Sequence, residues 1–202
     1  MKTAFLYMAA FFGSISLYAQ QNVPLNPADI SPLLIGEQIP DVKLQNAQGE
    51  QVSLLRVVNQ KPSVLVFYRG GWCPYCNAHL AELQTAEPEI IRTGYQIVAI
   101  SPDAPENLAK SGSKHRLKYL LLSDSRAEAI SAFGLAFQAP ERYLETLQNY
   151  SRGENHTLMP VPAVFVVNKK GEILFEYINP NYKTRIKASL LLAVLKELNE
   201  DI

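Results

Sequence analysis

Apolar and polar positions along the chain follow two patterns that together predict a single α/β domain. Continuous apolar runs are typical of strands buried on both faces of a sheet, and they occur at 63–68, 96–101, 119–122 and 163–168. Leucine and isoleucine at helical spacing follow the first run and recur over 185–199, which predicts a helix in each place. Alternating residues at 41–44 and 51–54, on either side of the turn 46–49, predict a hairpin.

This order of elements predicts a central mixed β-sheet with helices on both faces and an N-terminal β-hairpin. Turn and capping residues mark the other helices. Asp103, followed by Pro105, predicts one helix start, and the capping box Ser125–Glu128 predicts another, which ends at Gly134. Pro140 opens a short amphipathic stretch toward Tyr150, and Pro88 predicts a kink or early end in the helix that contains it.

The first 19 residues have the pattern of a secretory signal peptide. Lys2 supplies a positive start, residues 3–17 are mostly apolar, and Ala19 offers a small residue for cleavage. The alternative is a membrane anchor, but about 15 apolar residues fall short of the ~20 that span a bilayer. We expect residues 20–35, rich in Pro, Asn and Gln, to be an extended leader and 36–202 to be the domain. Export places the protein in an oxidising compartment, which we expect to be a bacterial periplasm.

The balance of basic and acidic side chains limits the kinds of binding partner that the sequence favours. The chain has 19 basic and 19 acidic side chains and no Lys/Arg run, so nothing favours binding to nucleic acid or an anionic membrane surface.

Cys73 and Cys76 are the only cysteines in the chain. They lie at the start of the helix that follows the run 63–68, where two thiols can close and reopen a small disulfide ring. A static structural disulfide is the alternative, but a chain of 202 residues buries enough apolar surface without one. The sequence predicts a redox site here.

The spacing Cys76-x-x-His79 also suggests a metal site. A closed zinc site needs four ligands, and the remaining candidates, His115 and His156, are far along the chain. We therefore expect no metal, flavin or haem, and we expect His79 to face solvent.

The position of the cysteines, together with Val161-Pro162 before the next-to-last strand, resembles the thioredoxin fold. That resemblance implies a cis Pro162 lying against the disulfide. The alternative is a trans proline that only opens the strand, since cis X–Pro bonds are a minority.

Five longer motifs are Gly36-Glu-Gln-Ile-Pro-Asp41, Phe67-Tyr-Arg-Gly-Gly-Trp-Cys-Pro-Tyr-Cys76, Ile100-Ser-Pro-Asp103, Leu122-Ser-Asp124 and Leu158-Met-Pro-Val-Pro-Ala163. Together they resemble the alkyl hydroperoxide reductase C/thiol-specific antioxidant (AhpC/TSA) family, in its peroxiredoxin-like branch with Cys-Pro-Tyr-Cys. The resemblance covers about residues 36–182 and implies a thiol-dependent peroxidase.

Carried over residue by residue, the resemblance places Cys76 at the peroxidatic cysteine and Cys73 where peroxiredoxins have a threonine. Pro162 occupies the place of their thiolate-stabilising arginine. Arg69 could supply that charge instead, since a guanidinium is always protonated, or it could point to solvent. The resemblance to thioredoxin exchanges the roles of the two cysteines. Cys73 is then the nucleophile, because free N–H groups at the helix N-terminus stabilise its thiolate, and Cys76 is the resolving thiol. The sequence leaves the nucleophile open.

The remaining residues of the motif are supporting candidates. Pro74 and Tyr75, between the cysteines, are expected to affect the reduction potential. Trp72 and Tyr75 could form an apolar rim for a substrate or a partner's disulfide, or could simply pack against the helix.

The expected function is reduction of hydrogen peroxide or organic hydroperoxides through a Cys73/Cys76 dithiol–disulfide cycle, with a thioredoxin-type or other dithiol donor as reductant. A thiol–disulfide oxidoreductase acting on exported proteins is the second hypothesis. A non-catalytic binding module with a structural disulfide is the third.

Overall fold

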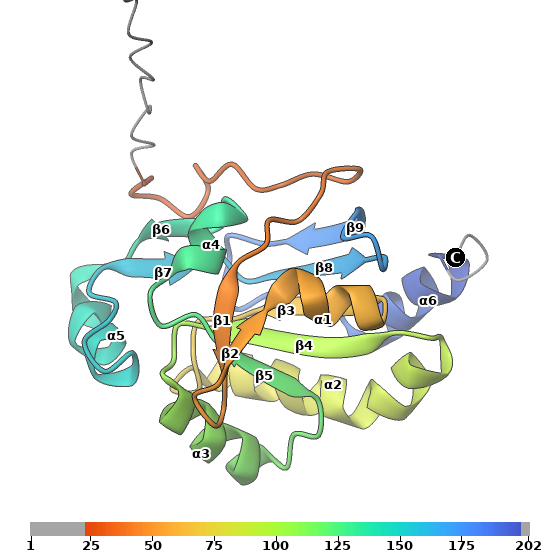
Figure 1. Ribbon diagram of the computed structural model, residues 1–202. Coiled ribbons are helices and arrows are strands. Elements are labelled where there is room, and N and C mark those ends of the chain that lie inside the picture. Colours follow the sequence, from red (N-terminus) through yellow and green to blue (C-terminus); the bar gives the residue numbers. More distant parts are fainter. Residues whose placement is uncertain (1–22, 199–202) are drawn as a thin grey trace, which may run out of the picture.

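The computed structural model describes residues 23–198, which form a seven-stranded mixed sheet in the order β2-β1-β5-β4-β3-β8-β9 (Figure 1). The strands are β1 (Lys43–Asn46), β2 (Gln51–Ser53), β3 (Ser63–Phe67), β4 (Gln96–Ser101), β5 (Leu120–Ser123), β8 (Ala163–Val167) and β9 (Ile173–Ile178). Strand β4 runs parallel to β3 and β5, and the other neighbours are antiparallel. The predicted mixed sheet and the β1–β2 hairpin are confirmed. The predicted signal peptide lies outside the described residues.

Helices cover both faces of the sheet. On one face lie α2 (Pro74–Arg92), α3 (Pro105–His115) and α6 (Ala188–Leu198), and on the other lie α1 (Leu54–Gln60) and α4 (Glu128–Ala132). Successive side chains of a strand point to opposite faces, so Val64 and Val66 of β3 join the first core and Leu65 joins the second. Strand β3 is therefore buried on both sides, as its continuous apolar run predicts.

A smaller unit packs beside the sheet. Strands β6 (Ala136–Gln138) and β7 (Leu158–Pro160) pair antiparallel, and the short helix η1 (Glu141–Tyr143) leads into α5 (Leu144–Tyr150). The sequence predicted the stretch 140–150 but not the two-stranded sheet, whose strands are only three residues long.

Residues 23–35 form no helix or strand. They are nevertheless held to the domain, because the Gln138 N–H donates to the Pro24 carbonyl at 2.9 Å and the Leu33 N–H to the Phe133 carbonyl at 3.2 Å. Val23 and Ile30 are partly buried against the core.

Two predicted helix caps are wrong. Helix α3 follows Ala104 and α4 follows Ala127, and neither cap residue makes a side-chain hydrogen bond. The role given to Ser125 is taken by Asp124, whose carboxylate accepts the N–H groups of Ala129 and Ile130 at 2.9 Å. Asp103 faces the cysteine loop, as described below.

Helix α2 continues through Pro88 to Arg92, so of the two predicted alternatives, a kink or an early end, the early end is excluded. Leu83 and Ile90, on either side of the proline, are both buried in the same core, and this packing outweighs the hydrogen bond that proline cannot make.

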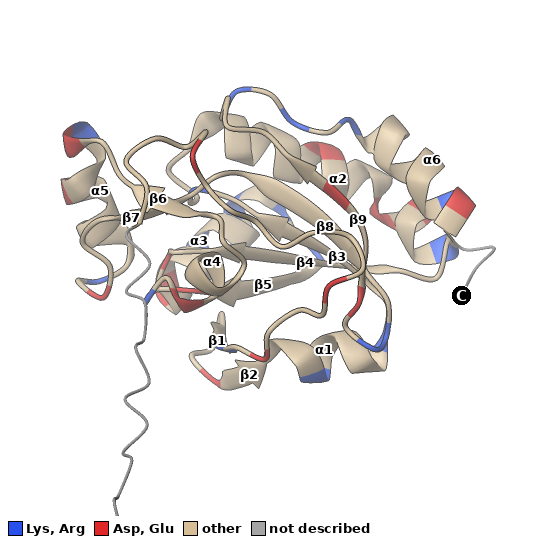
Figure 2. Cartoon of the chain, turned by 90° about the horizontal axis from the view of Figure 1, so that it is seen from above, with Lys and Arg blue, Asp and Glu red and all other residues tan. Residues whose placement is uncertain are grey.

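Charge is spread over the molecule. Figure 2 shows Lys and Arg interspersed with Asp and Glu on helices at both ends of the sheet, in keeping with a net charge of zero. None of the helices formed by residues 23–198 combines the length and apolar character that crossing a bilayer requires.

Candidate active site

The two cysteines lie where β3 gives way to α2. Cys73 is the residue before the helix and Pro74 is in its first turn, where a missing N–H costs no hydrogen bond. The Cys73 N–H donates to the Gly70 carbonyl at 3.1 Å, and its carbonyl accepts the Asn77 N–H at 3.0 Å. The Cys73 thiol is thus fixed at the positive end of a 19-residue helix.

A glycine loop holds this arrangement in place. The Gly71 N–H donates to Oδ2 of Asp103 at 2.6 Å, and the Asn77 side chain donates to the Gly71 carbonyl at 2.9 Å. Gly70 has φ +138°, and a Cβ there would lie 2.4 Å from Nε1 of Trp72 and 2.6 Å from Oδ1 of Asp103. Only glycine fits this position.

Asp103 is the residue that sequence reasoning assigned to a helix cap. It is buried, and burial raises its pKa to about 7, although the hydrogen bond from Gly71 opposes the rise. Its role is to position the loop before the cysteines.

The two thiols are free and buried. The pKa of Cys73 is lowered to about 6, first by the hydrogen bond from the Cys76 thiol, then by the Cys76 N–H and the charges of Arg69 and Arg185. Burial raises the pKa of Cys76. Near neutral pH the pair therefore carries a thiolate on Cys73 and a proton on Cys76.

Arg185 is a site residue that the sequence did not reveal. Its Nη2 lies 3.5 Å from Sγ of Cys76. The pattern suggested that 185 begins the terminal helix, but α6 begins at Ala188, and Arg185 lies in the segment that leads into it. No local motif marks it, because 109 positions separate it from Cys76.

Arg69 does not point to solvent, because only 2% of it is exposed. Its guanidinium carbon lies 4.8 Å from the ring centre of Trp72, 4.5 Å from that of Tyr143 and 4.2 Å from that of Tyr182. Such cation–π contacts stabilise a buried charge. Arg69 can therefore supply positive charge near Cys73, and Tyr143 and Tyr182 are further site residues that sequence reasoning missed.

Pro162 does not have the expected cis bond, since every peptide bond among the described residues is trans. Flanking hydrogen bonds keep the segment extended: the Val161 N–H donates to the Leu135 carbonyl at 2.9 Å, and the Pro162 carbonyl accepts the Asn179 N–H at 3.3 Å. Pro162 and Arg69 both line a pocket beside the cysteines.

The other two aromatic candidates differ in exposure. Trp72 is partly buried and its ring centre is 5.3 Å from that of Tyr143, so it packs inside the site. Tyr75 is 41% exposed, with its ring centre 5.7 Å from that of Tyr182, and forms the outer rim.

His79 does not face solvent as expected, because only 5% of it is exposed. Burial, followed by the charge of Arg185, lowers its pKa to about 4, so the imidazole is neutral at neutral pH. In the described part of the chain, no three His, Cys, Asp or Glu side chains form a group that could hold a metal ion.

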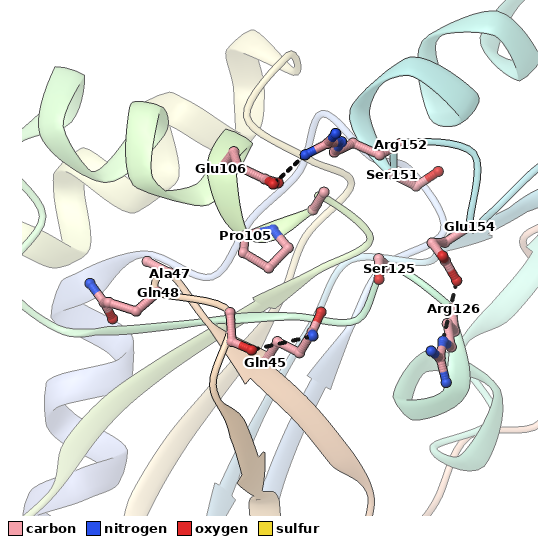
Figure 3. A pocket seen from close by; sticks show the side chains of 12 residues that line it. Gln45, Ala47, Gln48, Pro105, Glu106, Ser125, Arg126, Ser151, Arg152 and Glu154 are labelled. Atoms are coloured by element: carbon pink, nitrogen blue, oxygen red, sulfur yellow. Dashed lines mark hydrogen bonds and ion pairs between the residues drawn. The ribbon is translucent and has the colours of Figure 1, made fainter.

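A pocket of about 490 Å³ lies away from the cysteines, between the β1–β2 turn and the start of α3 (Figure 3). Its charged side chains pair with one another: Arg152 with Glu106, and Arg126 with Glu154 at 3.2 Å. Neither cysteine lines it. The reactive groups are at the start of α2, and we place the site there.

Known proteins resemble this chain in sequence and in fold. The sequence model of the AhpC/TSA family matches residues 35–175. The chain belongs to this family. It is 28% identical to the putative peroxiredoxin bcp of Haemophilus influenzae, over 74% of this chain and 98% of that protein. It is 25% identical to peroxiredoxin Bcp of Bacillus subtilis, over 82% of this chain and 97% of that protein.

A solved structure supports the fold of this AhpC/TSA protein. The bacterioferritin comigratory protein of Xanthomonas campestris, studied for its alkyl peroxide reduction activity, superposes with a TM-score of 0.65 at 19% identity, over 82% of this chain and 99% of that one. The predicted thioredoxin-like fold is confirmed.

Proposed function

We propose that this AhpC/TSA protein is a thiol-dependent peroxidase that reduces hydrogen peroxide or organic hydroperoxides. The observation that carries the proposal is the pair of free thiols at the start of α2, where the pKa of Cys73 is lowered and that of Cys76 is raised. A thiolate is the form of cysteine that attacks peroxides, and a neighbouring thiol can resolve the product. The family and the peroxiredoxin relatives support peroxide as the substrate.

The reaction has two steps within the protein. The Cys73 thiolate attacks the peroxide oxygen that carries a hydrogen, the O–O bond breaks, and the other oxygen leaves as alkoxide or hydroxide and takes a proton from water. Cys73 is then a sulfenic acid. The Cys76 sulfur attacks the Cys73 sulfur, the S–O bond breaks, and hydroxide leaves with the Cys76 proton as water. A dithiol donor reduces the Cys73–Cys76 disulfide by thiol–disulfide exchange.

The surrounding residues support Cys73 as the nucleophile and Cys76 as the resolving thiol. The position before α2 favours a negative charge on Cys73, and Arg69 and Arg185 favour it further. Cys76 is buried, so it retains its proton until the sulfenic acid forms. This assignment follows the thioredoxin reading, in which the first cysteine attacks.

The donor and the compartment form part of the proposal. An exposed Tyr75 between the cysteines offers an apolar contact for a thioredoxin-type donor. The signal-peptide pattern of residues 1–19 supports export to a bacterial periplasm, where peroxide stress is direct and a reducing partner must be supplied.

A thiol–disulfide oxidoreductase acting on protein disulfides is the second candidate. The specific observation in its favour is that the acidic thiol is the first of the Cys-x-x-Cys pair, the position from which thioredoxin-type proteins attack.

Paired assays distinguish the candidates. Residues 20–202 are reduced and supplied with thioredoxin, its reductase and hydrogen peroxide or an organic hydroperoxide, and an insulin reduction assay is run in parallel. We expect peroxide consumption that the double variant Cys73→Ser/Cys76→Ser abolishes, and a sulfenic acid that dimedone traps on Cys73 in Cys76→Ser.

Insulin reduction without peroxide consumption would reject the peroxidase in favour of the second candidate. If dimedone traps a sulfenic acid on Cys76 in Cys73→Ser, but none on Cys73 in Cys76→Ser, Cys76 is the nucleophile and Cys73 the resolving thiol. If neither thiol reacts, both enzymatic functions fail.

A further inference from the structure

A pocket of about 240 Å³ opens beside the cysteine loop and has no part in the reaction steps above. Its walls come from five places in the chain: the leader, the loop after β3, the stretch from β6 to η1, the stretch from β7 to the start of β8, and the segment after β9. The lining residues that carry the argument are Arg69, Phe137, Arg142, Tyr143, Met159 and Tyr182.

The charge on these walls is of one sign. Arg69 and Arg142 line the pocket, and no Asp or Glu is present among the described residues that line it. Arg142 is exposed at the surface, whereas Arg69 is 2% exposed. A pocket lined, within the described part of the chain, by two cations and by no acidic residue favours an anionic ligand.

Arg69 adds a directional preference. Its Nε and Nη2 are buried and have no hydrogen-bond partner within residues 23–198. These two nitrogens are neighbours on the planar guanidinium, and their spacing matches the two oxygens of a carboxylate. A buried donor without a partner is unfavourable, so an anion that pairs with this edge gains more than a surface ion pair would. Tyr143 and Tyr182 both pack on Arg69 and line the pocket, so a ligand that pairs with this edge has to displace one of the two rings.

The rest of the pocket is largely apolar and stiff. Phe137 and Met159 contribute apolar walls, and five prolines contribute to the lining: Pro27, Pro140, Pro160, Pro162 and Pro180. Proline fixes the backbone φ angle, so these walls are largely formed before a ligand arrives. The volume is below the roughly 300–1,000 Å³ typical of drug-sized ligands, so a small molecule fits best.

We propose that this pocket binds a small organic carboxylate, with its apolar body against Phe137 and Met159 and its carboxylate paired with Arg69 and Arg142. The site is separate from the reacting sulfurs, and the proposal does not depend on peroxide being a substrate.

Calorimetry with two matched probes tests the proposal. Phenylbutyrate and phenylbutanol share an apolar body and differ in the carboxylate. We expect the reduced protein to bind the acid saturably and about tenfold or more tightly than the alcohol, since a hydrogen bond to a charged group is at stake. Trp72, the only tryptophan in the chain, stacks on Arg69, and we expect its fluorescence to change with the same saturation curve.

Variants assign the preference to the two cations. Arg69→Gln should bind acid and alcohol about equally, and Arg142→Gln, which changes an exposed side chain and leaves the fold intact, should reduce the preference for the acid. Lys170→Gln removes an exposed charge in the turn before β9 and should leave the preference unchanged.

Equal binding of the two probes, or no saturable binding of the acid, would overturn the proposal. So would an unchanged preference in Arg142→Gln and Arg69→Gln, and if Arg69→Gln does not fold, the result for Arg142→Gln decides. Because only binding is measured, either outcome is independent of the peroxidase assay.

Discussion

The guanidinium of Arg185 lies 3.5 Å from the sulfur of Cys76, the second cysteine of a pair that is buried at both positions. Cys76 keeps its proton because burial outweighs that charge, whereas Cys73, at the N-terminus of α2, carries the thiolate. The cation beside one sulfur therefore lowers the pKa of the other.

Replacing Arg185 should make Cys73 a weaker acid. In Arg185→Gln we expect alkylation of Cys73 by iodoacetamide to be slower by about two- to tenfold near neutral pH, because a nearby cation favours the thiolate. The rates should converge at high pH, where both proteins carry a full thiolate. Arg92→Gln, at the far end of the same helix, is the control and should behave as the wild type. Identical pH profiles for Arg185→Gln and wild type would contradict the assignment.

The pH profile of the wild type should show the lowered pKa directly. Alkylation of Cys73, followed by mass spectrometry of the cysteine peptide, should rise with an inflection near the pKa of about 6. An unperturbed thiol would give its inflection at about 8.5. The Cys76→Ala variant should shift the inflection upward, because it removes the hydrogen bond that lowers the pKa most, while the arginines remain. An inflection near 8.5 in the wild type would remove the basis for Cys73 as the nucleophile.

Asp103 should make stability fall as pH rises. Its folded pKa of about 7 lies above the unfolded value of about 3.9, so between these values the folded protein holds a proton that the unfolded chain has released. This contribution is fully present below about pH 4 and is lost as pH rises through 7.

Replacing the carboxyl with an amide removes that titration. The free energy of unfolding of the reduced protein is measured by urea denaturation. Between the two pKa values, the difference Asp103→Asn minus wild type should increase by roughly 1.4 kcal/mol for each unit that the pH rises. Asp124, whose pKa burial also raises to about 7, is present in both proteins and cancels from the difference. A difference that does not change between acid and neutral pH would exclude the raised pKa.

Alanine at position 70 should damage the site as well as the fold. Gly70→Ala places a Cβ against Trp72 and Asp103 at a positive φ, so we expect a loss of about 3 kcal/mol or more in unfolding free energy and slower alkylation of Cys73. Gly49→Ala is the matched control, because its φ is +82° but nothing lies within 4 Å. It should cost only the backbone penalty of about 1–2 kcal/mol. Equal losses in the two variants would mean that the contacts around Gly70 do not matter.

The features predicted from sequence are those with local signals. Strands β3, β4 and β8 have continuous apolar runs, and the Cys-Pro-Tyr-Cys motif fixes both thiols at one helix start. The missed features depend on distant segments. Tyr143, Tyr182 and Arg185 reach the site only because the β6–α5 unit and the segment after β9 fold against the cysteine loop.

The wrong predictions for Asp103 and His79 both arise from contacts with segments that are distant in the sequence. The sequence around Asp103 is typical of a helix cap. In this fold, however, its carboxylate accepts the Gly71 N–H and does not cap α3. His79 has the polarity of a surface residue, yet the turn of α2 that carries it is covered by the segment around Ile186. Sequence spacing cannot indicate which of two available partners a side chain takes.

The family match ends at residue 175, whereas Tyr182 and Arg185 lie after it. A chain shortened to the matched segment would keep both sulfurs and lose the cation beside Cys76 together with one ring that shields Arg69. Proteins that are assigned to the family because they match this segment can therefore share the same cysteine motif and still differ in the pKa of the thiol. The tail that follows β9 is the place to compare when one relative reacts quickly with electrophiles and another does not.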